Sequence, residues 1–234
     1  MELISGDSLP SDAFRLVTVC TANICRSPAM ASVLLNGVEG RPGLLDSGIH
    51  LTSAGVAAAP GIAIDSRTAE ALERAGFPVP GTVSTQLQPE QIASADLILT
   101  ASRRHRAKIV RTLPQAREWT FTMREFARYC ELVSADTLQG DHDPAARLRT
   151  ALAQAQEMRG FAVPARPEDD DLADPIDGAP RVHRKMVRLI AASADSILAV
   201  TAGATGPQRA PSKSTEGSSG WGTLVELSRS LSPR

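Results

Sequence analysis

Two side chains with complementary chemistry, a thiol and a guanidinium, stand close together in the segment CTANICRSP. Cys20 opens the segment, and Arg26 follows after five intervening residues, directly before Ser27. A cysteine thiolate is a strong nucleophile, and the planar fork of a guanidinium binds two oxygens of a phosphate-like dianion. The pair therefore predicts a site where sulfur attacks phosphorus, with Cys20 as the nucleophile and Arg26 as the anion ligand.

The residues around this pair have the pattern of a loop between a strand and a helix. The apolar run Phe14–Cys20 predicts a buried strand, and the residues from Pro28 onward have helical composition with Ser27 as the N-cap. Such a loop directs backbone N–H groups inward, and the helix dipole adds positive potential that favours a thiolate near neutral pH. The expected anion cradle consists of Thr21, Ala22, Asn23, Ile24, Cys25 and Arg26.

The rest of the chain alternates between strand-like and helix-like runs. Further strands are predicted over Ile49–Gly55, 97–101 and 118–122. Helices are predicted over residues 28–35, 65–75, 102–113, 144–158 and 179–200. Alternating strands and helices are typical of βαβ units, so the pattern predicts an α/β fold with a parallel sheet.

The overall composition is that of a soluble globular protein. Hydrophobic residues make up 42% of the chain and charged residues 22%, with a formal net charge of −1. This balance gives no field that would recruit nucleic acid or an anionic membrane, and no apolar run is long enough to span a bilayer. The N-terminal residues lack the pattern of a signal peptide, and three cysteines without a disulfide framework indicate the cytoplasm. The four histidines share no metal-ligand spacing with the cysteines, so we expect no metal and no cofactor.

The segment CTANICRSP resembles the phosphate loop C-x-G-N-x-C-R-S-P of the low-molecular-weight protein tyrosine phosphatases. The resemblance implies a flavodoxin-like three-layer sandwich around a small parallel sheet of about four strands. It also implies a phosphocysteine mechanism that acts on phosphotyrosine or a related phosphoester of a protein or small molecule. In this family, a serine matched by Ser53 in LTSAG supports the loop asparagine, here Asn23, and Ser27 donates a hydrogen bond to the thiolate.

The family's general acid is an aspartate in a D-P-x-x-G segment before the last helix, which Asp174 in DPIDG matches. The resemblance implies that Asp174 protonates the leaving oxygen and then activates water. Two other acidic segments compete for this role. Asp143 precedes a predicted helix and is explained as its cap, and residues 169–171 are explained as a solvated acidic loop.

The resemblance also suggests a division of the chain. Residues 1–13 would form an N-terminal arm and residues 14–201 a phosphatase-like domain, with an insertion at about 130–171. Residues 202–234 are rich in Gly, Ser, Pro and Thr, so they are expected to form a disordered tail.

Three positions depart from the family pattern. Ala22 replaces a glycine, which would strain the loop if that position needs a positive φ. Thr82 stands in the place of a histidine near the loop asparagine. Ile176 and Asp177 replace aromatic residues that form a slot around a phenyl phosphate. The last change predicts weak hydrolysis of phosphotyrosine peptides, poorest for acidic peptides that Asp177 would repel.

Two other functions and one further role remain open at the level of sequence. An arsenate reductase that uses a small external thiol would need only Cys20, and a phosphate-binding module would need only the cradle. Cys25, five residues after Cys20, is either a redox partner that forms a disulfide with it under peroxide or a small packing residue.

Overall fold

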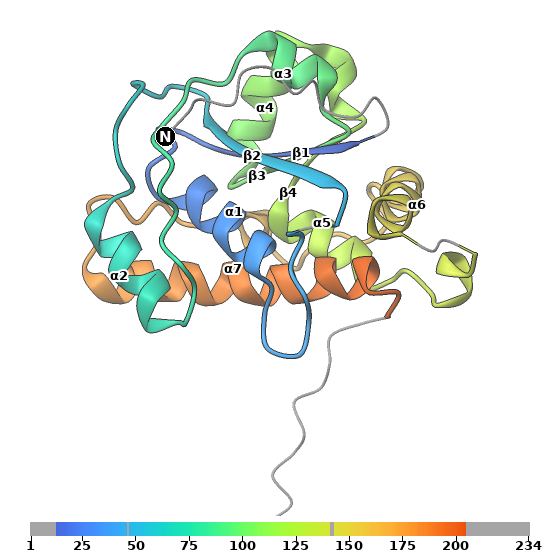
Figure 1. The fold of residues 1–234 in the computed structure, drawn as a ribbon. Helices are drawn as coiled ribbons and strands as arrows, with labels where there is room; N and C mark the ends of the chain where they lie inside the picture. Colours follow the sequence, from blue (N-terminus) through green and yellow to red (C-terminus); the bar gives the residue numbers. More distant parts are fainter. Residues whose placement is uncertain (1–12, 46, 141–142, 205–234) are drawn as a thin grey trace, which may run out of the picture.

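The protein, described by a computed structural model over residues 13–45, 47–140 and 143–204, is built around four parallel strands. These are β1 (Phe14–Cys20), β2 (Ile49–Gly55), β3 (Leu97–Thr100) and β4 (Thr120–Thr122), in the spatial order β2-β1-β3-β4 (Figure 1). The central strands β1 and β3 are almost wholly buried, as expected for parallel strands covered on both faces. Since every strand is parallel to its neighbour, all four carboxyl ends lie at one edge, where Cys20 ends β1.

Helices cover both faces of the sheet (Figure 1). One layer contains α1 (Arg26–Asn36), α5 (Met123–Cys130) and α7 (Pro180–Thr201), with α2 (Ser66–Arg74) packed on α7. The other layer contains α3 (Pro89–Ser94), α4 (Arg103–Thr112) and the 3-10 turn η1 (Pro114–Arg117). Each layer shares its own hydrophobic core with the sheet, and the core on the side of α1 and α7 is the larger. The predicted three-layer α/β sandwich with a four-stranded parallel sheet is confirmed.

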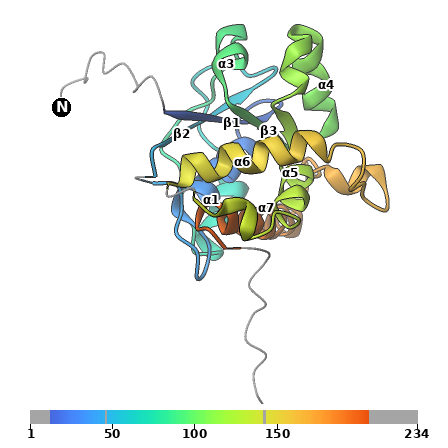
Figure 2. The same ribbon diagram turned by 90° about the vertical axis from the view of Figure 1, so that its right-hand side faces the viewer.

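The stretch expected to be an insertion contains α6 (Pro144–Glu157) and the 3-10 turns η2 (Asp136–Leu138) and η3 (Pro167–Asp170). Figure 2 shows α6 crossing the molecule in front of the other elements, and the Arg149 guanidinium lies 5.4 Å from the centre of the Phe14 ring. Because Phe14 begins β1, α6 lies at the amino end of that strand, away from Cys20. After η3 the chain returns to the carboxyl edge, where the Leu172 N–H donates to the Ala101 carbonyl at 2.8 Å.

Most predicted elements are present, with bounds that differ by a few residues. α1 begins at Arg26, two residues before the predicted start, and β3 and β4 are shorter than predicted. The sequence analysis did not predict α3 or α5. The predicted N-terminal arm and tail lie almost wholly outside the described residues. Among the described helices, none combines the length and the apolar character needed to cross a membrane.

Candidate active site

Cys20 and Arg26 stand at the two ends of the predicted loop. Cys20 is the last residue of β1, Arg26 is the first residue of α1, and both are buried. The loop turns at Asn23, whose φ of 58° is the only positive value among described residues other than glycine. Asparagine tolerates this left-handed conformation better than most residues. Ala22 does not adopt it, so the expectation of strain at Ala22 is wrong.

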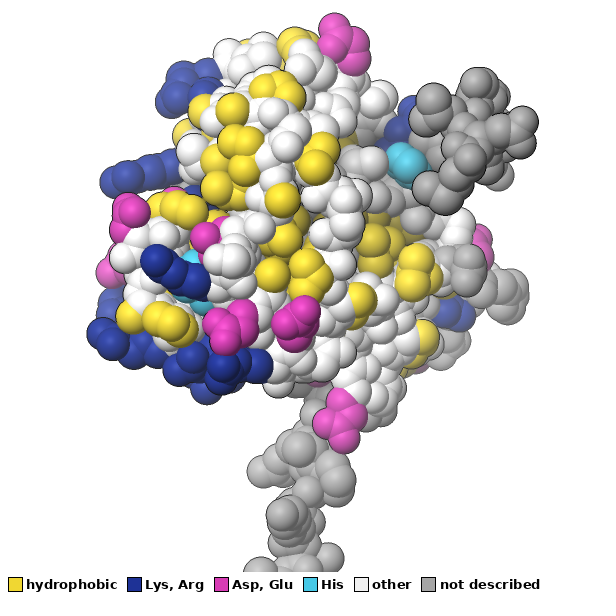
Figure 3. All heavy atoms as spheres, turned by 60° about the vertical axis from the view of Figure 1, so that its left-hand side comes forward, with side chains coloured by type: hydrophobic (Ala, Val, Ile, Leu, Met, Phe, Trp, Pro, Cys, Tyr) yellow, Lys and Arg dark blue, Asp and Glu magenta, His cyan; other side chains and the backbone are white. Residues whose placement is uncertain are grey.

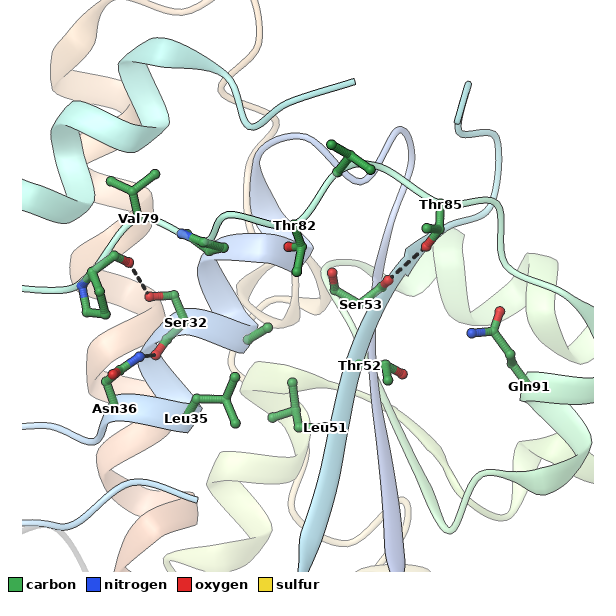
Figure 4. Close-up of a pocket in the computed structure, with 14 residues that line it drawn as sticks. Ser32, Leu35, Asn36, Leu51, Thr52, Ser53, Val79, Thr82, Thr85 and Gln91 are labelled. Atoms are coloured by element: carbon green, nitrogen blue, oxygen red, sulfur yellow. Dashed lines mark hydrogen bonds between the residues drawn. The ribbon is translucent and has the colours of Figure 1, made fainter. Parts of the chain in front are cut away.

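The side-chain amide of Asn23 joins the loop to two neighbouring segments. Its Nδ2 donates to the Oγ atoms of Ser27 and Ser53 at 2.9 and 3.0 Å, and its Oδ1 accepts from the backbone N–H of Thr85 at 2.9 Å. Thr85 also donates from Oγ1 to the Ser53 carbonyl at 3.1 Å (Figure 4). The structure thus brings Ser53 to Asn23. The hydrogen bond that the amide oxygen of Asn23 accepts comes from Thr85, and not from Thr82, which stands in the place of the family histidine.

A cavity of about 390 Å³ lies beside this network, between α1, β2 and the segment 78–85 (Figure 4). Ser53, Thr82 and Thr85 form part of its wall, and Leu35 and Leu51 form part of its apolar side. The sheet's carboxyl edge is turned forward in Figure 3, where hydrophobic side chains occupy the middle of the face. The catalytic candidates do not line this cavity, so it is separate from the candidate active site.

Ser27 is not the N-cap of α1, because the helix begins before it. Its Oγ lies 3.0 Å from the Sγ of Cys20 and 3.3 Å from the Ala54 carbonyl, and it accepts the hydrogen bond from Asn23. The predicted capping role is therefore wrong. The hydroxyl instead faces the candidate nucleophile, where it can donate to a thiolate.

Arg26 and Asp174 meet although 148 residues separate them. Nη2 of Arg26 donates to Oδ2 of Asp174 at 2.5 Å, and Nη1 donates to the Leu172 carbonyl at 3.3 Å. The Arg26 side chain is only 7% exposed, whereas that of Asp174 is 49% exposed. The buried Nε of Arg26 finds no hydrogen-bond acceptor among the described residues. A buried guanidinium donor requires an acceptor, and an oxygen of a phosphate bound at the loop would provide one.

The competing acidic residues are engaged in other contacts. Asp143 caps α6, accepting from the Ala146 N–H at 2.8 Å, as expected. The run 169–171 is not a freely solvated loop, because each carboxylate contacts an arginine. The pairs are Asp169 with Arg166, Asp170 with Arg128, and Asp171 with Arg103. Asp174 is therefore the carboxylate that the fold brings to Arg26.

His105 is a buried neighbour of the loop that the sequence analysis did not assign to the site. Its Nε2 lies 2.9 Å from the Oγ1 of Thr21 and its Nδ1 lies 2.8 Å from the Oγ of Ser102. Burial, together with the positive charge of Arg26, lowers the pKa of His105 to about 4, so the ring is neutral at pH 7. No sequence signal marks this residue, because only the packing of α4 against the end of β1 brings it to Thr21.

Cys25 is buried in the same loop as the candidate nucleophile. It is 4% exposed, and burial raises its pKa to about 11, against the opposing effect of a hydrogen bond with Thr68. Its thiol is therefore protonated at neutral pH. Cys20, Cys25 and Cys130 are all free cysteines.

A cleft of about 450 Å³ opens beside Arg26 and Asp174. Its apolar walls are aliphatic, from Val56, Ala57, Leu172 and Ala173, and its lining includes the imidazole of His105 but no Phe, Tyr or Trp of the described chain. Ile176 and Asp177 do not line it either. In the same described residues, no three His, Cys, Asp or Glu side chains are grouped so that they could hold a metal ion.

Comparison with known proteins adds to this geometry. A family model described as low molecular weight phosphotyrosine protein phosphatase matches residues 15–157, which include the Cys20 loop and end before Asp174. A protein-arginine-phosphatase of Geobacillus stearothermophilus is 33% identical over 127 residues, which are 54% of this chain and 80% of the relative. The low molecular weight protein-tyrosine-phosphatase Ptp of Acinetobacter johnsonii is 35% identical over 108 residues, 46% of this chain and 70% of the relative.

Solved structures share the fold. The YwlE arginine phosphatase from Geobacillus stearothermophilus matches with a TM-score of 0.55 and 25% identity, covering 79% of this chain and 90% of its own. A low molecular weight protein tyrosine phosphatase from T. tengcongensis matches with a TM-score of 0.55, covering 79% of this chain and 97% of its own. At 22% identity, the match to the T. tengcongensis structure shows only that the fold is shared.

The proteins matched above are phosphatases, and so they favour phosphoester hydrolysis through a phosphocysteine over arsenate reduction or passive phosphate binding. The residues matched by the family model cover more than half of the chain and contain the Cys20–Arg26 loop. The chain therefore belongs to the low molecular weight phosphotyrosine protein phosphatase family and is a cysteine-dependent phosphatase.

Proposed function

We propose that this enzyme removes phosphate from phosphotyrosine or a related phosphorylated side chain, with Cys20 as nucleophile, Arg26 as phosphate ligand and Asp174 as general acid. The contact of 2.5 Å between Arg26 and Asp174 carries the proposal. It supports the general-acid role, because it holds the Asp174 carboxyl group beside Arg26, which stands at the end of the loop that Cys20 begins.

In the first step, phosphate oxygens accept hydrogen bonds from Nε and Nη2 of Arg26 and from the loop N–H groups. The substrate thereby displaces the Asp174 carboxylate from Nη2, and the freed carboxylate takes up a proton from solvent. The Cys20 thiolate attacks phosphorus, the S–P bond forms and the bond to the leaving oxygen breaks, while protonated Asp174 gives its proton to that oxygen. Ser27 stabilises the thiolate by a hydrogen bond, since its Oγ lies 3.0 Å from Sγ.

In the second step, water attacks the phosphocysteine. The Asp174 carboxylate takes a proton from this water, the S–P bond breaks, and inorganic phosphate leaves with the Cys20 thiolate restored. Asp174 is then protonated again for the next turnover. Asn23 and Ser53 support both steps indirectly, because their hydrogen bond holds the turn of the loop.

A second substrate, phosphoarginine, is favoured by two observations. The apolar walls of the cleft are aliphatic, and no Phe, Tyr or Trp among the described residues lines it for a phenyl ring to pack against. Two relatives at 33% and 34% identity are protein-arginine-phosphatases, from Geobacillus stearothermophilus and Bacillus subtilis. The same phosphocysteine would form from a P–N bond as from a P–O bond. Comparing kcat/KM for peptides that differ only in phosphotyrosine or phosphoarginine decides between the two substrates.

The roles proposed for Cys20 and Asp174 predict different losses of activity when each residue is replaced. Cys20→Ser should abolish hydrolysis of p-nitrophenyl phosphate, whereas Cys130→Ser, at the buried cysteine that ends α5, should retain it. Asp174→Asn should slow alkyl phosphates by roughly 10²–10⁴-fold and aryl phosphates with good leaving groups far less, because only poor leaving groups need a proton. Asp143→Asn, which keeps a good helix cap, is the matched control. Equal losses on both substrate types would remove Asp174 as the acid.

We also propose that Cys25 is the redox partner of Cys20 and that the enzyme works in the cytoplasm. Both thiols are buried in one short loop, and the chemistry requires Cys20 in its reduced form. A reducing compartment maintains that form, and a disulfide to Cys25 would protect the nucleophile during oxidation.

A further inference from the structure

One wall of the cleft beside Asp174 is strongly cationic. Arg104, Lys108 and Arg111 line it, and their spacing places them on one stripe of α4. All three residues are exposed. Seven residues of helix span about 10 Å, so this stripe is as long as about three residues of an extended peptide. Lys and Arg side chains also line the left margin of the face shown in Figure 3.

Among the cationic side chains of α4, these three are the ones that no acidic side chain of the described residues neutralises. Their helix neighbours Arg103 and Arg106 pair with Asp171 and Glu125. In contrast, no carboxylate of the described chain pairs with the three residues of the stripe, and Lys108 contacts only the Val56 carbonyl, at 2.7 Å.

The two carboxylates in the cleft do not cancel this charge. Asp171 is held by Arg103 and Asp174 is held by Arg26. His105, which lies behind the stripe, is neutral at pH 7. The cleft therefore presents a net positive wall to anything that projects from the candidate phosphate site.

From this arrangement we infer that the enzyme selects phosphorylated peptides that carry acidic residues one or two positions from the phosphorylated residue. An anionic side chain there would lie over the stripe formed by Arg104, Lys108 and Arg111 (the α4 stripe) while the phosphate occupies the loop. The inference rests on the proposed function and names its substrate class. It reverses the expectation from Asp177, because Asp177 does not line this cleft, whereas the three residues of the stripe do and are basic.

The test compares three phosphotyrosine peptides in which the residues flanking the phosphorylated side chain are acidic, alanine or basic. The readout is the ratio of kcat/KM for the acidic peptide to kcat/KM for the alanine peptide. A change in a variant's overall activity affects both values equally and leaves this ratio unchanged. Wild type should show a ratio of about three to ten, carried by KM, because exposed charge pairs are weak and act on association and binding. Raising the salt concentration from about 0.05 M to about 0.5 M should reduce the ratio.

Neutralising the α4 stripe should remove the preference. Arg104→Gln/Arg111→Gln retains the contact between Lys108 and Val56, so it is the first variant, and Arg104→Gln/Lys108→Gln/Arg111→Gln is the second. The ratio should fall toward one in both. The control Arg184→Gln/Lys185→Gln/Arg188→Gln makes the same charge change on exposed positions of α7 and should keep the wild-type ratio. Circular dichroism and melting temperature establish that each variant is folded.

Turnover without preference for the acidic peptide, or a preference that survives loss of the stripe, would overturn the inference alone. Absence of any turnover of phosphopeptides and of p-nitrophenyl phosphate by wild type would overturn the proposed function and the inference together.

Discussion

At the scale of the residue, the hydroxyl of Ser27 has one proton and more than one neighbour that can accept it. Because Asn23 donates to the Ser27 oxygen, the Ser27 proton is left to point toward the Cys20 sulfur or toward the Ala54 carbonyl. Residue type and the following proline predicted only an N-cap. The family resemblance also implied a hydrogen bond from Ser27 to the thiolate, and the position of the Ser27 Oγ is consistent with it. The contact with Ala54, which belongs to a strand distant in sequence, could not be inferred from local pattern.

Oxidation of Cys25 can be tested at the scale of the residue, because its pKa of about 11 sets the fraction of this thiol that is present as thiolate. Peroxide oxidises the Cys20 thiolate to a sulfenic acid and releases hydroxide. The Cys25 thiolate then attacks that sulfur and displaces a second hydroxide, which leaves a disulfide. Below pH 11 the thiolate fraction of Cys25 rises about tenfold per pH unit, so disulfide closure should quicken by about tenfold for each unit, or roughly 100-fold from pH 7 to 9.

Mass spectrometry after timed peroxide exposure at pH 7, 8 and 9 measures this closure. Sulfinic acid on Cys20 should dominate at pH 7 and the Cys20–Cys25 disulfide at pH 9. Cys25→Ser should give sulfinic acid throughout, and Cys130→Ser should behave as wild type. Failure to detect the linkage at any of these pH values would leave Cys25 with a packing role alone.

At the scale of the element, the end of β2 determines the space available to the loop. The predicted bounds Ile49–Gly55 are those observed. The sequence could not show that a side chain at Gly55 would collide with the loop. A Cβ there would lie 2.5 Å from the Thr21 carbonyl oxygen and 2.9 Å from the Cβ of Ala58. The undetected helices α3 and α5 are only 6 and 8 residues long, too short for a periodic pattern.

Gly55→Ala is therefore expected to displace the loop and to lower both stability and activity. Overpacking of this kind costs about 1–3 kcal/mol in the free energy of unfolding. We expect kcat/KM for p-nitrophenyl phosphate to fall at least about tenfold, because small displacements of reacting groups cost rate steeply. Gly81→Ala is the control, since a Cβ at Gly81 meets no atom within 4 Å and its φ is not in the left-handed region. Unchanged kcat/KM in Gly55→Ala would show that the loop tolerates the displacement.

At the scale of the whole molecule, the site joins the first βα unit to the segment before the last helix. The sequence predicted each part, because CTANICRSP and DPIDG are local motifs. Their meeting depends on the return of the chain after α6 and η3, where Leu172 contacts Ala101 and brings Asp174 to Arg26. The contact of His105 with the loop also depends on packing between distant segments. Spacing along the chain puts Arg104, Lys108 and Arg111 on one side of α4, but only the fold brings that stripe to the cleft beside Arg26.

The most direct test of the two-step chemistry is rapid acid quenching of Asp174→Asn during turnover of p-nitrophenyl phosphate, followed by mass spectrometry. This substrate forms the phosphocysteine without much help from an acid, whereas its hydrolysis by water loses its base, so the intermediate should accumulate. We predict a phosphoryl group on Cys20 and none on Cys25 in the same peptide. Turnover that continues with no phosphoryl group on Cys20, or with the group on Cys25, would contradict the proposed mechanism.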